Sequence, residues 1–222
     1  MTMLALLHTS QVVIRPINDL ARTLMPRVAL MNLLDDGILG QIARTSGVDA
    51  VRRRVERLAQ CATDANADAL LITCSSISEL AASAAKASGL PVYTIDEAMA
   101  EEAVRRGTRI GVLATVATTL DPTCRLIERK AKEAGKRITI RRALADDAFA
   151  ELSRGNANAH DEILHNALVT LAATEGVIVL AQASMARLID GLGEQRIPIL
   201  ASPRLGLERV RAQLQARGLA AD

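Results

Sequence analysis

The sequence predicts an α/β protein that consists of two pseudo-symmetric, Rossmann-like lobes with parallel sheets. Short apolar runs alternate with helical segments along all 222 residues, which is typical of strands that are joined by crossover helices. The apolar runs are almost solid, as in parallel sheets that are covered on both faces. The pattern also starts again near the middle of the chain. We therefore expect the active site in a cleft between the two lobes, where their strand ends face each other.

The first half of the chain contains four predicted strands, at 3–7, 28–34, 69–73 and 91–95. Helical segments are predicted at 16–24, 48–66, 77–88 and 96–106. The segment 48–66 has the clearest pattern, because its valines and alanines fall on one helical face and its arginines lie elsewhere. The segment 96–106 follows a capping-box spacing and stops at Gly107.

The second half repeats this order, with predicted strands at 109–114, 138–144, 177–180 and 198–201. Helices are predicted from the turn after Thr115 to Gly135, in a short stretch ending at Arg154, and at 160–174 and 205–217. Corresponding landmarks of the two halves lie 106 to 111 residues apart, and Cys74 corresponds to Gln182, 108 residues later. We assign residues 1–97 and 205–222 to the first lobe and residues 98–204 to the second.

The composition argues against nucleic-acid and membrane partners. The chain has 27 basic and 25 acidic residues, a net charge of +2, one Tyr, one Phe and no Trp. Nucleic-acid modules usually need a basic stripe and stacking aromatic residues. No apolar run approaches the roughly 20 residues that a membrane span requires, and the first eight residues lack the basic flank of a signal peptide. We expect a cytoplasmic homo-oligomer that binds a small molecule.

The sequence also argues against a zinc site, a disulfide framework and a nucleotide cofactor. The three cysteines, Cys61, Cys74 and Cys124, are too widely spaced for a zinc site and odd in number for a disulfide framework. His160 and His165 are five residues apart and do not share a helix face as metal ligands would. No glycine-rich dinucleotide or phosphate-binding motif follows any predicted strand.

Cys74 is the leading candidate for a catalytic group. It lies where a buried strand ends and a helix begins, which is the edge of a parallel sheet where ligands bind. Because the start of a helix favours negative charge, we expect a lowered pKa for this thiol and the fastest reaction among the three cysteines. Cys61 and Cys124 fall within helical patterns and are expected to be structural.

Hydroxyl groups gather at the predicted strand ends. These residues are Thr9, Ser10, Ser75, Ser76, Thr115, Thr118, Thr119 and Ser184. Each one alone is explained by helix capping, but together they form a set of neutral donors that suits a carboxylate. His8 ends the first strand, where it is either a proton-transferring group or a hydrogen-bonded structural histidine.

Three short motifs carry a family resemblance. They are Thr73–Ser76, Gly111–Thr115 with the following Thr118 and Thr119, and Val179–Ser184. With these motifs the whole chain resembles the aspartate/glutamate/hydantoin racemase superfamily. The resemblance implies two α/β lobes, no metal or organic cofactor, and a small carboxylate as substrate. Typical racemases of this kind place one cysteine on each lobe, on opposite faces of the carbon next to the carboxylate.

The sequence departs from that pattern at two positions. Gln182 stands where the second cysteine is expected, and His8 stands where glutamate racemases carry an acidic residue. An amide is not a base, so Cys74 remains as the only thiol for proton transfer next to a carboxylate, with Gln182 as a binding group. The alternatives are a single-cysteine decarboxylase similar to arylmalonate decarboxylase, a cis–trans isomerase of the maleate type in which the thiol adds to an alkene, and a non-catalytic sensor of small acids.

Overall fold

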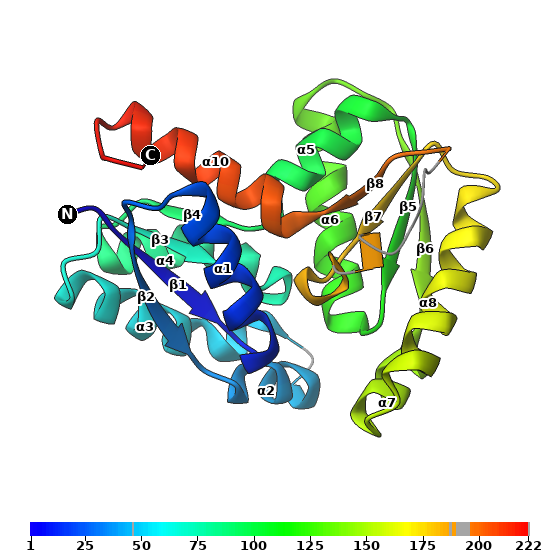
Figure 1. Ribbon diagram of the computed structural model, residues 1–222, viewed down its shortest axis with the longest axis horizontal. Coiled ribbons are helices and arrows are strands. Elements are labelled where there is room, and N and C mark those ends of the chain that lie inside the picture. Colours follow the sequence, from blue (N-terminus) through cyan, green and yellow to red (C-terminus); the bar gives the residue numbers. More distant parts are fainter. Residues whose placement is uncertain (46, 187, 190–195, 222) are drawn as a thin grey trace. The chain divides into compact units, whose positions relative to one another are not determined.

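The computed structural model describes residues 1–45, 47–186, 188–189 and 196–221 (Figure 1). The chain forms two compact units, Met1–Asp96 with Pro203–Asp222, and Glu97–Ser202. Each unit contains a four-stranded sheet in which all neighbouring strands are parallel. The prediction of an α/β protein with two parallel sheets is therefore confirmed.

The two sheets have the same strand order, β2-β1-β3-β4 in the first unit and β6-β5-β7-β8 in the second. The strands are β1 Met3–His8, β2 Ala29–Leu34, β3 Ala69–Ile72, β4 Val92–Thr94, β5 Arg109–Ala114, β6 Thr139–Leu144, β7 Val177–Leu180 and β8 Ile199–Ala201. The equivalence extends to single hydrogen bonds. Thr73 N–H donates to the Leu7 carbonyl at 3.0 Å, and Ala181 N–H donates to the Leu113 carbonyl at 2.9 Å. Cys74 and Gln182 are the next residues in the chain after these two bonds, so they occupy corresponding positions.

The helical elements lie between and after the strands. In the first unit they are η1 Gln11–Val13, α1 Ile14–Leu24, α2 Gly37–Thr45, η2 Val48–Val51, α3 Arg52–Asp64, η3 Ser75–Leu80, α4 Ala81–Ser88 and α10 Ser202–Ala216. In the second unit they are α5 Glu97–Arg106, α6 Ala117–Glu133, α7 Asp146–Ser153, α8 Ala157–Ala172 and η4 Ala183–Ala186. The η elements are 3-10 helices, which are tighter and shorter than α-helices.

Three helical segments differ from the sequence-based expectation. Helix α2 was not expected, because its two glycines and nine residues give a weak helical pattern. The helix predicted at 48–66 begins as the 3-10 turn η2 and ends where Asn66 adopts a positive φ of 61°. The helix predicted at 77–88 starts earlier, as the 3-10 helix η3 directly after Cys74, and becomes α-helical only at Ala81.

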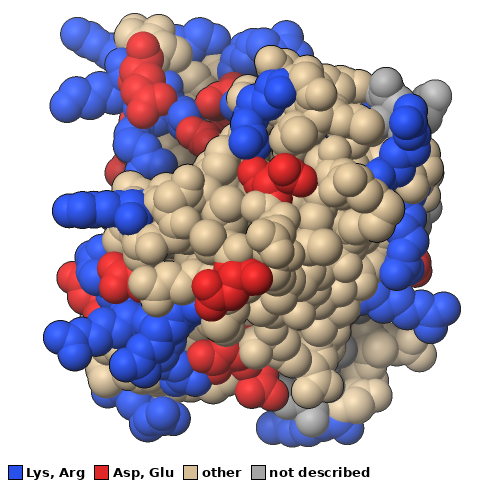
Figure 2. Space-filling model, turned by 90° about the vertical axis from the view of Figure 1, so that its left-hand side faces the viewer, with Lys and Arg blue, Asp and Glu red and all other residues tan. Residues whose placement is uncertain are grey.

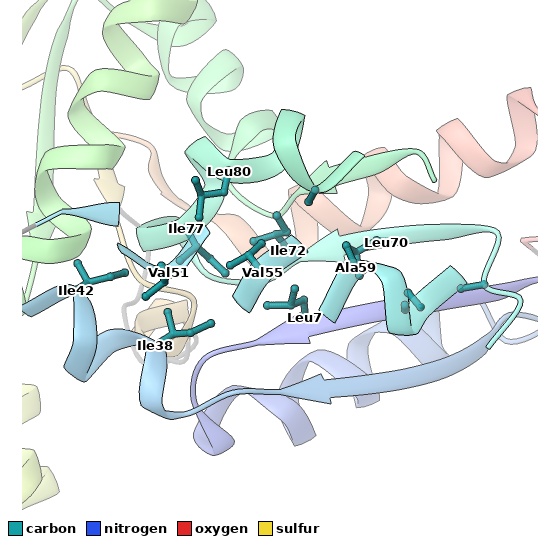
Figure 3. Packing of buried hydrophobic residues seen from close by; sticks show 14 residues of the cluster. Leu7, Ile38, Ile42, Val51, Val55, Ala59, Leu70, Ile72, Ile77 and Leu80 are labelled. Carbon is teal, nitrogen blue, oxygen red and sulfur yellow. The ribbon is translucent and has the colours of Figure 1, made fainter. Parts of the chain in front are cut away.

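Both faces of the central strands β1 and β3 of the first sheet are buried, which explains their solid apolar sequences. Along β1, Leu4 and Leu6 point to a cluster that includes α1 and α10, while Ala5 and Leu7 point to a cluster that includes α2, α3 and η3. Figure 3 shows the second cluster, in which Val55 of α3 lies close to side chains of the sheet. This alternation follows from the two-residue period of a strand.

The second sheet is covered in the same way. Leu113, Ile178 and Leu180 form a cluster with buried leucines of α8 on one face. Helices α5 and α6 contact strands of the same sheet. The central strands β3 and β7 are therefore buried along their whole length, whereas the edge strands β2 and β6 expose polar residues such as Asn32 and Arg142.

Helix α10 packs closely against the rest of the first unit, with its glycine Gly206 next to the backbone of Ile95. It follows the last strand of the second unit but belongs to the first, just as α5 follows β4 but belongs to the second. Its buried Leu207, Val210 and Leu214 pack with Leu4 and Leu6 of β1. At Gly206, a Cβ atom would lie 2.3 Å from the Ile95 carbonyl oxygen, so only glycine fits there.

The substitution Gly206→Ala tests this contact. We expect it to lower the free energy of unfolding by about 1–3 kcal/mol, because the obstacle is a backbone atom that cannot rotate away. Denaturant titration of both variants against the unmodified protein measures the change. Gly40→Ala is the matched control, since Gly40 lies exposed in α2 and meets only the flexible end of Arg44. That variant should gain up to about 1 kcal/mol from helix propensity; equal stability of the two variants would contradict the proposed contact.

Candidate active site

The carboxyl edge of the first sheet brings Thr9 and Cys74 together. Strands β1 and β3 pair in parallel, with Leu7 opposite Ile72, so the residues that follow each strand emerge side by side. The Thr9 hydroxyl forms a hydrogen bond with the Cys74 thiol. Ser10 follows at the start of η1, where it is half-buried and makes no capping bond with its side chain. Thus two segments that lie far apart in sequence form one polar site.

Cys74 is half-buried and occupies the position immediately before η3, with an extended backbone (φ −127°, ψ 118°). Burial raises its pKa above the ordinary thiol value, although Thr9 and both the N–H and the hydroxyl of Ser76 act to lower it. The expected lowering of the Cys74 pKa is therefore wrong. The desolvation of the thiolate outweighs its hydrogen bonds, and the negative charge of Asp96 acts in the same direction as burial.

His8 is fully buried, and both of its ring nitrogens have partners. Nε2 lies 2.8 Å from Oδ1 of Asn32, and Nδ1 lies 2.8 Å from the Thr73 hydroxyl. A neutral ring satisfies both contacts when Nε2–H donates to Asn32 and the single proton of the Thr73 hydroxyl goes to Nδ1 and not to the Leu7 carbonyl, which lies 2.9 Å from the same hydroxyl. Burial lowers the His8 pKa, which favours this neutral form. His8 of β1 thus links Asn32 of β2 with Thr73, the residue before Cys74.

Asp96 is a component of this site that the sequence reading treated only as part of a helix cap. Its side chain is 1% exposed, and both carboxylate oxygens accept from the Ser78 hydroxyl, at 2.9 and 3.0 Å. The hydroxyls of Thr94 and Ser75 and the backbone N–H of Asp96 also form hydrogen bonds with it. Burial raises the pKa of this carboxyl. The only signal for this cluster in the sequence is the position of Asp96, an acidic residue that follows β4 in a chain in which several other strand ends carry hydroxyl residues.

In the second unit, Thr115 and Gln182 form a pair that corresponds to Thr9 and Cys74. The amide oxygen of Gln182 accepts from the Thr115 N–H at 2.6 Å and lies 3.0 Å from its hydroxyl, while the amide nitrogen lies 2.9 Å from that hydroxyl. A backbone N–H can only donate, so this contact fixes which end of the amide faces Thr115. The half-buried Gln182 side chain therefore presents N–H donors and no free carbonyl oxygen.

The remaining hydroxyl candidates of the second unit lie near the same sheet edge. Val116, with an extended backbone, precedes α6, and Thr118 and Thr119 lie in the first turn of that helix. Thr119 is buried, whereas Thr118 is half-buried. Ser184 is exposed in η4, the short helix that follows Gln182. The second unit thus offers hydroxyl and amide groups at its strand ends but no thiol.

Cys61, Cys124 and His160 belong neither to the Thr9–Cys74 pair nor to the Thr115–Gln182 pair. Cys61 is exposed on α3, and Cys124 is buried in α6, where burial raises its pKa to about 11. His160 is buried at the start of α8, with its Nδ1 2.7 Å from Asp161. In the described residues no group of three or more His, Cys, Asp and Glu side chains could hold a metal ion. The predicted cleft shared by Cys74 and Gln182 stays a prediction.

The charged surface is mixed. On the face in Figure 2, Lys and Arg stand mainly near the margins, and acidic side chains lie both among them and within the largely uncharged centre. Several basic groups have acidic partners, such as Lys130 with Glu97 at 2.6 Å. Within the part of the chain that the structure describes, no helix is long and apolar enough to cross a membrane. The expected lack of nucleic-acid binding and the homo-oligomer stay predictions.

Solved structures with the same two-lobed α/β fold include three racemases. The glutamate racemase isoform RacE1 of Bacillus anthracis has a TM-score of 0.77 at 17% identity, with 100% of this chain and 84% of that chain covered. The Picrophilus torridus aspartate racemase has a TM-score of 0.72 at 11% identity, covering 100% and 96% of the two chains. The allantoin racemase of Klebsiella pneumoniae has a TM-score of 0.64 at 20% identity, covering 100% and 91%. A search of curated protein sequences gave no significant match.

The fold and the polar strand ends define a two-lobed α/β protein of the racemase type. The family model for Asp/Glu/Hydantoin racemase matches residues 8–210. The chain therefore belongs to the Asp/Glu/hydantoin racemase family, as the resemblance of its motifs indicated.

The geometry predicts the order in which the three thiols react. We expect Cys61 to be alkylated first at neutral pH because it is exposed, Cys74 next, and Cys124 last because it is only 1% exposed. Pulse alkylation followed by peptide mass spectrometry measures the three rates. This order replaces the expectation that Cys74 reacts fastest. Faster labelling of Cys74 than of Cys61 would show that the thiolate is more stable than its burial implies.

Proposed function

We propose that this protein is a cofactor-independent isomerase that moves a proton at the carbon next to a carboxylate, with Cys74 as the catalytic residue. Membership of the racemase family supports the reaction class. The single observation that carries the assignment of the residue is the position of Cys74, at the carboxyl edge of β3 and in contact with the Thr9 hydroxyl and with Ser76. Ligands of parallel α/β proteins bind at this edge.

In the proposed reaction, the Cys74 thiolate takes a proton from the carbon atom, and the electron pair of the broken C–H bond moves into the carboxylate to give an enediolate. The same thiol, or a water molecule, then returns a proton to the carbon. The hydroxyls of Thr9 and Ser76 already lie at the Cys74 sulfur, and we propose that they bind the carboxylate and its added charge, while the Ser75 hydroxyl stays on Asp96. His8 is proposed as a positioning residue, because its ring is buried and both nitrogens are engaged.

Gln182 is proposed as a binding residue for an oxygen acceptor. Thr115 holds its amide so that N–H groups remain to donate, and a carboxylate or water oxygen accepts such bonds. An amide cannot exchange a proton as the second thiol of a two-cysteine racemase does. The proposed chemistry is therefore one-sided, and inversion of the carbon centre requires a proton from solvent or from another group. Thr118, Thr119 and Ser184 are proposed as further donors at this edge.

The raised pKa of Cys74 favours one second candidate, a decarboxylase. A thiol that rests in its protonated form is suited to deliver a proton to a carbanion left by the loss of carbon dioxide. In this reaction the C–C bond breaks, its electron pair stays on the substrate carbon, and the thiol proton is transferred there. The thiolate then regains a proton from water.

Replacement of Cys74 tests the assignment directly. We expect Cys74→Ala to lower turnover by about 10²- to 10⁴-fold, the usual contribution of a proton-transferring group. The assay uses heavy water and a panel of amino acids, hydroxy acids, disubstituted malonates and maleate, with deuterium incorporation and product configuration as readouts. Cys61→Ala is the matched control and should remain active. Unchanged activity of Cys74→Ala would remove the thiol from the mechanism, and ligand-induced stabilisation without any turnover would instead indicate a sensor.

The pH dependence separates proton removal from proton donation. If Cys74 acts as a base, kcat/KM should rise with pH and continue to rise through the ordinary thiol value of 9.0, because burial raises the Cys74 pKa and the thiolate is the active form. A thiol that only donates a proton should give a kcat/KM that is level and then falls over the same range. Steady-state rates between pH 6 and the highest pH at which the fold persists provide the measurement. Circular dichroism at each pH serves as the control.

A further inference from the structure

The structure points to a role for Asp96 that the proposed reaction does not include. Its carboxylate lies in the first unit, where it contacts Ser75 and Ser78 of the 3-10 helix that follows Cys74, and it is almost completely buried. We propose that Asp96 is a positioning residue for Cys74, which holds the start of η3 through Ser75 and Ser78 and acts on the thiol through its charge. The proposal rests on the proposed function only in taking Cys74 as the reactive group.

The Ser78 hydroxyl links the two residues. Its oxygen lies within hydrogen-bond distance of both Asp96 carboxylate oxygens and also 3.3 Å from the carbonyl oxygen of Cys74. A hydroxyl has one proton and can donate only once. While Asp96 is ionised, that proton goes to the carboxylate. When Asp96 is protonated, its own O–H donates to Ser78, and the Ser78 proton is free for the Cys74 carbonyl. The protonation state of Asp96 therefore changes how the Cys74 peptide is held.

Asp96 also differs from the other charged groups around η3 in its burial. Asp49 of η2, Glu79 of η3 and Lys86 of α4 are exposed, so water and salt screen their effect on the thiol. Asp35 at the end of β2 is paired with Arg54. Burial lowers the pKa of His8 of β1, which favours its neutral form. Asp96 has only hydroxyls and its own N–H among the hydrogen-bond partners that the structure shows, so its charge is the least compensated of these.

A purely structural role as a helix cap would require the same shape and hydrogen bonds but not the charge. Asparagine keeps the shape and one acceptor oxygen but removes the charge. The substitution Asp96→Asn therefore separates the two roles, whereas Asp96→Ala would disturb both. If Asp96 acts on the thiol through its charge, the neutral variant makes the thiolate easier to form.

The experiment measures the alkylation rate of Cys74 by iodoacetamide as a function of pH, in the unmodified protein and in Asp96→Asn. Mass spectrometry reads Cys61 in the same samples, as an exposed internal reference on α3. We expect the midpoint for Cys74 to move to lower pH by about 0.5–1 unit, the scale of a nearby charge, with no change at Cys61. Superimposable profiles for Cys74 in the two proteins would overturn the proposal.

A second measurement on the unmodified chain keeps the test valid if Asp96→Asn does not fold. In protein labelled with ¹³C at cysteine Cβ, the Cys74 resonance should show a second inflection, separate from that of the thiol, at the pH where Asp96 titrates, which burial moves above the ordinary Asp value. Ser78→Ala removes a donor to the carboxylate and should move this inflection to higher pH. Absence of the second inflection would overturn the proposal. Neither measurement uses a substrate, so a failure of the proposed isomerase activity leaves both outcomes interpretable.

Discussion

The structure depends on parallel strand pairing with both sheet faces buried. All four residues of β3 and all four of β7 are buried, and their backbone groups bond to neighbouring strands. Polar side chains therefore have no place within these strands and appear immediately after them. Because paired parallel strands end at the same edge, the residues that follow β1 and β3 must meet. The contact between Thr9 and Cys74 is a direct consequence of this geometry.

The same constraint explains how much could be predicted from the sequence. Solid apolar runs located the strands, and the recurring offset between Cys74 and Gln182 located two equivalent edges. The contact between Ser78 and Asp96 could not be predicted, because it joins a 3-10 turn to the end of β4 across 18 residues and leaves no periodic pattern. The direction of the Cys74 pKa shift could not be predicted either. A helix start is visible in the sequence, but the depth of the thiol below the surface is not.

The two units use one backbone arrangement for two kinds of chemistry. Thr9 and Thr115 follow equivalent strands, and each contacts the side chain that follows the neighbouring strand, Cys74 in one unit and Gln182 in the other. The first pair contains a group that can gain or lose a proton. The second contains only hydrogen-bonding groups that keep their protons. The internal repeat thus conserves position while the chemical properties of the two edges differ.

At both sheet edges, some polar groups are engaged in hydrogen bonds with one another. Thr73 is committed to the Leu7 carbonyl through its N–H and to His8 through its hydroxyl, and the Thr115 N–H is committed to Gln182. Groups that are used in this way cannot bind a ligand, but they fix the orientation of the groups that can. A donor that is already oriented need not reorganise when charge develops on a ligand, which is the main source of electrostatic stabilisation in enzymes. The fold therefore supplies fewer free donors than its many hydroxyl residues suggest, and holds Gln182 in a defined direction.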